Sequence, residues 1–236
     1  MNKDKWNYGG LNDKYNMQPG QIWTSGDGRI KLAVHDLRSK TGLLAFMTKA
    51  DCVFIDPPWN LGNVNSFVTK ADGAGGYVFD FNDFLRCVYA AIAQINPGVL
   101  YFEIGKEYLA DVIFGLRKMF KRVTFFNSTY YHNAKNLCYI VRATNRKRGA
   151  DIKPQLDGMD EENIIAWICE NEKFDIIGDF CMGRGLVGKY AIANGRKCVG
   201  TELNPKRLAV LVDFCEKNGV PLKPVPDNAF SSNIPA

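Results

Sequence analysis

Residues 175–202 read DIIGDFCMGRGLVGKYAIANGRKCVGTE, and this stretch decides the fold. A short apolar run leads into Gly183, Gly185 and Gly188, a helix-length stretch follows, and a second apolar run ends at Glu202. A G-x-G-x-x-G turn between strand and helix lets the backbone approach a ligand closely, and an acid after the next strand can hold a ribose diol. The stretch therefore predicts a βαβ unit that binds a dinucleotide or an adenosyl cofactor.

Asp179, at the end of the first of these strands, narrows the choice of cofactor. An acid at this place would repel a pyrophosphate, whereas it would suit the cationic amino group of S-adenosylmethionine. The alternative is that Asp179 only caps a loop or a helix.

Strand-like and helix-like stretches alternate along the rest of the chain. Strands are predicted at 30–34, 52–55, 99–103, 123–129, 137–143, 174–180 and 198–202. Helices are predicted at 36–48, 81–95, 106–120, 163–171 and 186–193, and a last one begins at Pro205. This alternation is typical of an α/β fold with a mostly parallel sheet and helices on both faces. We expect one domain over residues 1–236, with an irregular arm at 1–22, a loop region at 60–80 and an irregular tail at 221–236.

The composition is that of an ordinary globular protein, with 46% apolar and 23% charged residues. No apolar run reaches the 18 residues of a membrane span, and the opening MNKDKWNYGG has no apolar signal region. The seven cysteines are scattered and the only histidines are His35 and His132, which argues against a structural zinc site. We expect a cytoplasmic protein with reduced thiols, no metal and no membrane contact.

Positive charge is concentrated in one part of the chain. The net charge is +5, yet residues 112–150 contain no acid and nine lysines or arginines. Aromatic residues, Tyr130 and Tyr131 among them, are interleaved with these cations. Such a pattern favours a nucleic-acid surface, because phosphates attract cations and unpaired bases stack on aromatic rings. A solvated basic helix and loop, with several of the aromatics in the core, is the alternative.

A second motif, Asp56-Pro57-Pro58-Trp59, follows the predicted buried strand 52–55. Proline has no N–H, so this turn presents only acceptors, namely the Asp56 carboxylate and nearby carbonyls. An exocyclic amino group offers two donors, and Trp59 would supply a flat face for the ring that carries it. The alternative is an ordinary Pro-Pro turn with a capping acid and a packed tryptophan.

The motif Asp56-Pro57-Pro58-Trp59 resembles the D/N/S-P-P-Y/F/W motif of S-adenosylmethionine-dependent amino-methyltransferases that act on nucleic-acid bases. Residues 179–185, DFCMGRG, resemble the F-x-G-x-G motif of that family. The order, with the catalytic motif first, is that of the family's beta arrangement, and the resemblance spans roughly residues 30–215. It implies a Rossmann-like class I methyltransferase fold that transfers a methyl group to adenine N6 in DNA after base flipping.

The resemblance also implies roles for individual residues. The target amine would be held by Asp56, Pro57, Pro58 and Trp59. The cofactor S-adenosylmethionine would be bound by Asp36, Lys153, Asp179, Cys181, Gly183, Gly185 and Glu202. Substrate contacts are expected from Tyr130, Tyr131, Arg142, Arg146, Lys147 and Arg148, and nucleic acid would meet the segments 60–80 and 129–150.

The chain departs from the family in two places. Leu186-Val187 stands where many relatives have two small hydroxyl residues, and only residues 144–152 separate the predicted strand pair from Lys153, where many relatives insert a recognition region. We therefore expect a short or relaxed recognition site, or a homodimer or partner subunit that carries specificity.

Several alternatives to this function stay open. They are RNA adenine-N6 or DNA cytosine-N4 methylation, a non-catalytic nucleic-acid-binding subunit, a nicotinamide-dependent oxidoreductase and a protein-amide methyltransferase. The resemblance also implies a role in restriction–modification and a prokaryotic or phage origin.

Overall fold

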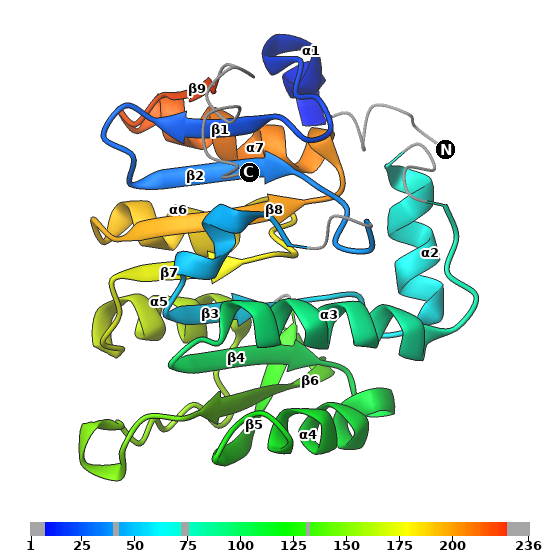
Figure 1. Cartoon of the computed structure of the whole chain (residues 1–236), viewed down its shortest axis with the longest axis vertical. Coiled ribbons are helices and arrows are strands. Elements are labelled where there is room, and N and C mark those ends of the chain that lie inside the picture. The colour runs from blue at the N-terminus through cyan, green and yellow to red at the C-terminus, as the bar shows by residue number, and fades with distance from the viewer. Residues whose placement is uncertain (1–7, 40–42, 72–75, 131–132, 226–236) are drawn as a thin grey trace, which may run out of the picture.

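The structure, a computed structural model, describes residues 8–39, 43–71, 76–130 and 133–225. Within these ranges nine strands form one sheet in the order β5-β6-β4-β3-β7-β8-β2-β1-β9, with helices on both faces (Figure 1). The strands are β1 (Ile22–Ser25), β2 (Ile30–Val34), β3 (Cys52–Ile55), β4 (Val99–Ile104), β5 (Arg122–Tyr130), β6 (Asn133–Thr144), β7 (Ile176–Asp179), β8 (Lys197–Glu202) and β9 (Leu222–Pro224). The helices are α1 (Leu11–Tyr15), α2 (Leu61–Lys70), α3 (Phe81–Ile95), α4 (Leu109–Arg117), α5 (Glu161–Asn171), α6 (Leu186–Ala193) and α7 (Pro205–Lys217).

The five central strands, β4, β3, β7, β8 and β2, lie side by side and parallel. On either flank β6 and β1 run antiparallel to them, and the outermost strands β5 and β9 turn back again. The sheet is therefore mixed, with antiparallel pairs on both sides of the parallel centre that the sequence predicts. The carboxyl ends of the central strands meet at one edge, and α2 stands at this edge on the right of Figure 1.

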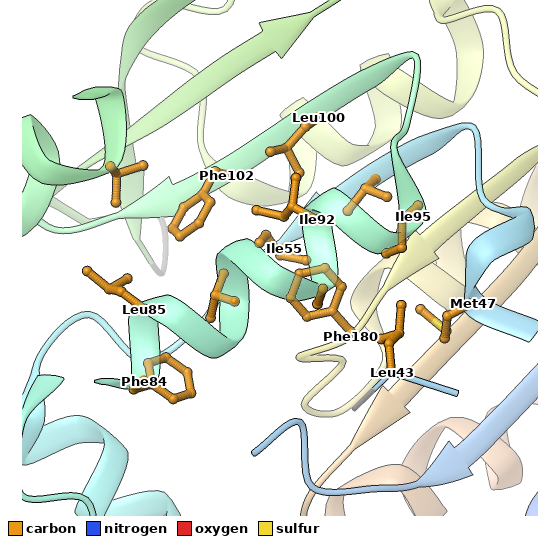
Figure 2. Close-up of a cluster of buried hydrophobic side chains, with 14 of the residues drawn as sticks. Leu43, Met47, Ile55, Phe84, Leu85, Ile92, Ile95, Leu100, Phe102 and Phe180 are labelled. Carbon is orange, nitrogen blue, oxygen red and sulfur yellow. The ribbon is translucent and has the colours of Figure 1, made fainter. Parts of the chain in front are cut away.

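One face of the sheet is covered by α3, whose apolar side chains recur every three or four residues and so share one side of the helix. They are Phe81, Phe84, Leu85, Val88, Ala91, Ile92 and Ile95. Figure 2 shows Ile92 beside Ile55 of β3 and Leu100 of β4. The Asp80 side chain accepts a hydrogen bond from the Asn82 N–H and caps the helix start. Pattern and cap together explain why the predicted helix 81–95 is confirmed.

The opposite face is covered by α5, α6 and α7. A Cβ atom at Gly185 would lie 2.5 Å from the Leu211 side chain of α7, and one at Gly188 would lie 2.7 Å from it. Helices α6 and α7 can come this close only because both positions are glycine. The glycines of the G-x-G-x-x-G turn therefore also allow α6 to pack closely against α7.

The largest error of the sequence prediction concerns residues 60–80, where a helix, α2, occupies Leu61–Lys70. Its sequence contains two asparagines and two β-branched valines, so its intrinsic helix propensity is low. The Asn60 side chain accepts a hydrogen bond from the Asn63 N–H, and Val64 and Val68 are buried against the core. Capping and tertiary packing, rather than propensity, form this helix.

Three smaller predictions are also wrong. Asp36 does not cap a helix over 36–48, since its carboxylate instead accepts hydrogen bonds from the Arg38 side chain. The chain turns after Asp36, and the helix found in the described part of this range is a short 3-10 helix, Ala45–Lys49. The arm 1–22 contains a 3-10 turn, Tyr8–Gly10, and α1, and it leads into β1, which the sequence analysis missed. The tail 221–236 begins with β9, which pairs with β1, and residues 226–236 lie outside the described ranges. In the described part of the chain, no helix is long and apolar enough to cross a membrane.

Candidate active site

A cavity of about 790 Å³ opens at the carboxyl ends of β2, β3, β7 and β8. Crevices at this edge of a parallel sheet are the usual ligand sites of such folds, and the volume is that of a small-molecule site. Residues from both sequence motifs line it, namely Asp56, Pro57, Pro58 and Trp59 from the first and Asp179, Cys181, Gly183 and Glu202 from the second. The fold thus brings together two motifs that lie more than a hundred positions apart in the sequence.

The glycine turn is closed by the acids that flank it. The Gly183 N–H donates to Glu202 Oε2 at 2.6 Å, and the Asn204 N–H donates to Glu202 Oε1 at 3.0 Å. The Cys181 N–H donates to Asp179 Oδ1 at 2.9 Å. Each carboxylate oxygen keeps a further lone pair, so both acids can accept donors from a ligand in the cavity. Burial raises the pKa of Asp179 well above its ordinary value, which a cation bound beside it would reverse.

Gly183 itself has a left-handed backbone with φ of 53°, and a Cβ atom there would lie 2.7 Å from the Arg207 guanidinium. The left-handed turn therefore requires the glycine, whereas the flexible end of the Arg207 side chain could shift to admit a Cβ atom. Arg207 comes from the first turn of α7, lines the cavity and lies over the Phe67 ring at 4.8 Å. It is a cavity residue that the sequence analysis missed, because a lone arginine after a helix start carries no motif.

On the other side of the cavity, two aromatic side chains hold Asp56. Trp59 Nε1 donates to Asp56 Oδ1 at 2.8 Å, and the Tyr130 hydroxyl donates to Asp56 Oδ2 at 3.3 Å. The two rings meet with centroids 5.1 Å apart and planes at 63°. Desolvation in the cavity raises the pKa of Asp56 to about 6, while the two donors oppose the rise. The two donors therefore favour the ionised form of Asp56 and fix the orientation of its oxygens.

Two further acids lie near Asp56 and were missed by the sequence analysis. β3 and β4 pair up to Ile55 and Phe102, so Asp56 and Glu103 are neighbours in the next register position. Glu103 is fully buried, and among the described residues neither of its carboxyl oxygens has a hydrogen-bond partner. Burial and the Asp56 charge raise its pKa well above the ordinary value, an effect that the Cys138 thiol only partly offsets. The acid inside the apolar run VLYFEI, 99–104, is the signal that could have found Glu103.

Glu161, in the first turn of α5, lines the same cavity. Burial raises its pKa to about 8, and the nearby Asp56 charge adds to the rise. Together with Asp56, Asp179 and Glu202 it makes the cavity rich in carboxylates, a set suited to a cationic ligand. No group of three or more His, Cys, Asp or Glu within the described ranges is arranged to hold a metal ion.

Solved structures share this architecture. TTHA0409 from Thermus thermophilus, named as a candidate DNA modification methylase, matches with a TM-score of 0.56 at 18% identity over 79% of this chain and 94% of that one. The same protein in complex with S-adenosyl-L-methionine gives 0.54 at 16% identity over 80% and 94%. The PvuII DNA methyltransferase, which is cytosine-N4-specific, gives 0.55 at 11% identity over 82% and 89%.

This chain has a Rossmann-like class I methyltransferase fold. At these identities the likeness concerns the fold alone. No protein-family model matches the sequence, and no curated protein sequence matches it.

Within this methyltransferase fold, the other predicted cofactor residues differ in position. Asp36 lines the cavity, and its two oxygens accept from the Arg38 Nε and a terminal nitrogen at 3.0 Å each. Lys153 is exposed and does not line the cavity. The helix predicted over 163–171 begins at Glu161, and residues 160–162 at its start line the cavity.

The basic residues predicted to bind substrate lie away from the cavity. β6 runs antiparallel to β4 and pairs Thr144 with Val99, so its last residues lie at the amino end of the central strands. Arg142 is 4% exposed and is therefore not available to nucleic acid. Its guanidinium binds Asp151 at 2.7 Å, Glu172 at 2.8 Å and the Tyr101 hydroxyl at 2.9 Å.

Arg146 belongs to the same buried group, since it pairs with Glu172 and donates to the Lys173 carbonyl. The substrate role predicted for Arg142 and Arg146 is corrected to a structural one. Lys147 and Arg148 are exposed at the same end of the sheet and do not line the cavity. Tyr131 lies outside the described residues. Of the predicted substrate contacts that the structure describes, only Tyr130 lines the cavity.

Proposed function

We propose that the protein transfers a methyl group from S-adenosylmethionine to the exocyclic N6 amine of adenine in DNA. The observation that carries the proposal is the single cavity into which both Asp56-Pro57-Pro58-Trp59 and the Gly183 turn open. One motif is suited to an adenosyl cofactor and the other to an amino-bearing base, and methyl transfer requires both ligands in contact.

The donor set of the cavity supports this cofactor. Glu202 would accept the ribose hydroxyls, and Asp179 would accept the cationic amino group. The acids around them fit a ligand with a positive sulfur, because their combined field favours a cation. When bound, the cofactor supplies a methyl group already activated by that sulfur, so the protein's task is alignment and exclusion of water.

Asp56 and the Pro57 carbonyl would each accept one hydrogen bond from the target amine. These bonds favour a pyramidal nitrogen whose lone pair is free to attack. The Asp56 carboxylate then stabilises the positive charge that develops on nitrogen and takes up the proton that the amine releases. Trp59, which donates to Asp56 Oδ1, fixes the orientation of that carboxylate.

DNA is the proposed substrate, and a target inside a duplex would have to flip out of the stack to reach the cavity. Adenine is proposed because position 56 is Asp, whereas cytosine-N4 members of the resembling family more often carry Ser there. A homodimer or a partner subunit would supply sequence recognition, since residues 144–152 leave no room for a recognition region.

The test is transfer of labelled methyl groups from S-adenosylmethionine to unmethylated duplex DNA, single-stranded DNA and RNA, followed by nucleoside analysis by mass spectrometry. N6-methyladenine in DNA is the expected product, and the Asp56→Ala protein should give none. N4-methylcytosine would move the proposal to the other amine, label in RNA alone would move it to RNA, and no label in any of the three would refute it.

A further inference from the structure

β5 is the outermost strand at one end of the sheet, and the surface beside it carries exposed apolar side chains. Figure 1 shows α4 alongside this strand. Phe125 of β5 is 51% exposed and Phe114 of α4 is 64% exposed. A groove of about 340 Å³ lies between the two elements and is lined by Ile113, Arg117, Val123, Thr124 and Phe125. Exposed apolar side chains that gather in this way mark a contact surface, and the proposed function assigns no role to it.

The same region is positively charged, and the protein itself does not neutralise the charge. Exposed lysines and arginines belong to the end of α4, to the turn before β5 and to the turn after β6, namely Arg117, Lys118, Lys121, Lys147 and Arg148. Within the part of the chain that the structure describes, none of these five forms an ion pair. The acids on either side are not available to them, because Asp111 lies at the far end of α4 and Asp151 is paired with Arg122 and Arg142. We call the five cations and the groove the β5 surface.

Hydrogen bonds fix the two turns of the β5 surface against each other. The Lys121 N–H donates to Asn145 Oδ1 at 2.9 Å, and Asn145 Nδ2 donates to the Met119 carbonyl at 3.2 Å. Lys147 and Arg148 follow Asn145 directly in the chain, so they are held near Lys121. The cations therefore form one ordered patch at the amino end of β5.

The charge of the β5 surface selects the class of partner. A second copy of this chain would bring the same unpaired cations face to face, which is unfavourable. A nucleic-acid duplex instead presents one negative charge for about every 1.7 Å of its length, so it can neutralise cations that are spread along the edge of a sheet. Aromatic rings beside cations, such as Phe125 beside Arg117, are typical of surfaces that bind nucleic acid.

β5 also connects this patch to the cavity. The strand runs from Arg122, next to the cations, to Tyr130, whose hydroxyl donates to Asp56. At about 3.3 Å per residue the strand is about 26 Å long. That length corresponds to roughly eight base pairs of duplex DNA, which rise 3.4 Å each. A duplex that leaves the cavity along β5 would reach the cations after that distance.

We propose that the β5 surface binds the phosphate backbone of the DNA that flanks the target base, roughly eight base pairs away from it. The identity of the substrate rests on the proposed function, whereas binding of nucleic acid to the β5 surface does not require methyl transfer. Contacts to phosphates position a duplex without reading its sequence. They would hold the substrate in a chain whose residues 144–152 leave no room for a recognition region.

The first test measures binding as a function of salt, without cofactor. Affinity for a long duplex of random sequence is compared between wild type, the double variant Lys118→Gln with Lys121→Gln, and the matched control Lys49→Gln with Lys223→Gln. Lys49 and Lys223 are also exposed, but they lie before β3 and in β9. Each lost phosphate contact lowers the slope of log K against log salt by about 0.9, so the slope should fall by roughly two in the double variant and stay unchanged in the control.

Two results of the salt experiment would overturn the proposal. An unchanged slope in the double variant would indicate that an acidic protein, and not nucleic acid, covers the β5 surface. The same fall in the double variant and in the control would indicate a general attraction of DNA to any lysine.

The second test varies the length of duplex beside the target base. For wild type, KM for methyl transfer should fall several-fold as the flank on one side grows from about four to about twelve base pairs, because the flank then reaches the cations. The double variant should show no such fall, and the control should behave as wild type. A wild-type KM that is independent of flank length, or an equal dependence in the double variant, would contradict the proposal. A wild-type protein that methylates nothing refutes the proposed function instead, and the salt slopes then decide whether the β5 surface binds nucleic acid.

Discussion

The two ends of the central strands both contain buried acids, but they use them in opposite ways. At the amino end, Glu172 is almost fully buried and accepts hydrogen bonds from Tyr101 and Arg142. It also forms an ion pair with Arg146. At the carboxyl end, Glu103 is equally buried and has no hydrogen-bond partner among the residues that the structure describes. Asp56, which is next to Glu103, and Asp179, which lines the same cavity as Asp56, accept within the described ranges only from neutral donors, an indole, a hydroxyl and a backbone N–H.

This difference in pairing distinguishes acids with a structural role from acids suited to bind a ligand. A buried acid that is paired with arginines has a structural role, because its negative charge is already neutralised by the protein itself. A buried acid without a cation raises its own pKa and destabilises the folded protein, so it persists where a ligand supplies the missing positive charge. We therefore infer that the carboxyl end of the sheet is the functional end, although most lysines and arginines of residues 112–150 lie elsewhere.

The largest expected effect comes from breaking the paired end. Arg142→Ala leaves Asp151 and Glu172 without their shared partner in a buried place, and should lower the free energy of unfolding by about 3–5 kcal/mol. Urea denaturation measures the change, and the exposed neighbour Lys147→Ala should stay within about 0.5 kcal/mol of wild type. A loss below about 1 kcal/mol for Arg142→Ala would show that the cluster is not structural.

The next effect concerns cofactor affinity at the unpaired end. Asp179→Asn removes the acceptor charge for the cofactor's amino group and should weaken S-adenosylmethionine binding roughly ten- to a hundredfold. Calorimetric titration measures it, with the exposed Asp111→Asn as the control. Unchanged affinity would mean that Asp179 only closes its loop through the Cys181 N–H.

Stability against pH sharpens the contrast between the two buried glutamates. The pKa of Glu103 is raised in the folded protein, so its contribution to stability is full at low pH and is lost as the pH rises above its ordinary value. Glu103→Gln removes that loss. The free energy of unfolding of the variant, relative to wild type, should therefore increase by up to about 1.4 kcal/mol for each pH unit above pH 4.5.

Glu172→Gln, in contrast, weakens the acceptor of two arginines and should be less stable than wild type at every pH from 5 to 8. Thermal unfolding across this range tests both variants. A constant difference for Glu103→Gln would mean that Glu103 is ionised in the folded protein.

The smallest expected effect is a dependence of cofactor affinity on pH. Burial raises the pKa of Asp56 to about 6 and that of Glu161 to about 8, and each carboxyl that loses its proton favours a cationic ligand. Affinity for S-adenosylmethionine should therefore rise from pH 5.5 to about 7.5, by up to roughly two- to fourfold for each group. Above that pH the α-amino group of the cofactor loses its own positive charge, which opposes a further rise. Glu161→Gln should flatten the upper part of the curve, and a curve unaffected by this change would place Glu161 outside the cofactor's field.

What the sequence predicts well is local. Helix 81–95 has an uninterrupted apolar pattern and a cap, and helix 186–193 and strands 30–34 and 52–55 are likewise confirmed. Each of the two motifs that line the cavity is an unbroken stretch of sequence, so both could be found without a structure. Their meeting in one cavity follows from the parallel order of β3, β7 and β8.

What the sequence could not predict depends on residues far apart. The absence of acids from residues 112–150 suggested that Arg142 is available to a ligand. Asp151, directly after that range, and Glu172, farther along the chain, pair with it. Glu103 and Arg207 are single residues brought to the site by β4 and α7, with no pattern around them. Helix α2 was missed because tertiary packing and not propensity forms it.

The most direct test of the account compares binding with transfer in one variant. Asp56→Ala should bind S-adenosylmethionine within about threefold of wild type, because Asp179 and Glu202 are the residues proposed to hold the cofactor. It should transfer methyl groups to adenine roughly a thousandfold more slowly in a single turnover. If Asp56→Ala transferred methyl groups at the wild-type rate, Asp56 would not be the acceptor for the target amine, and the role assigned to the unpaired end of the sheet would be wrong.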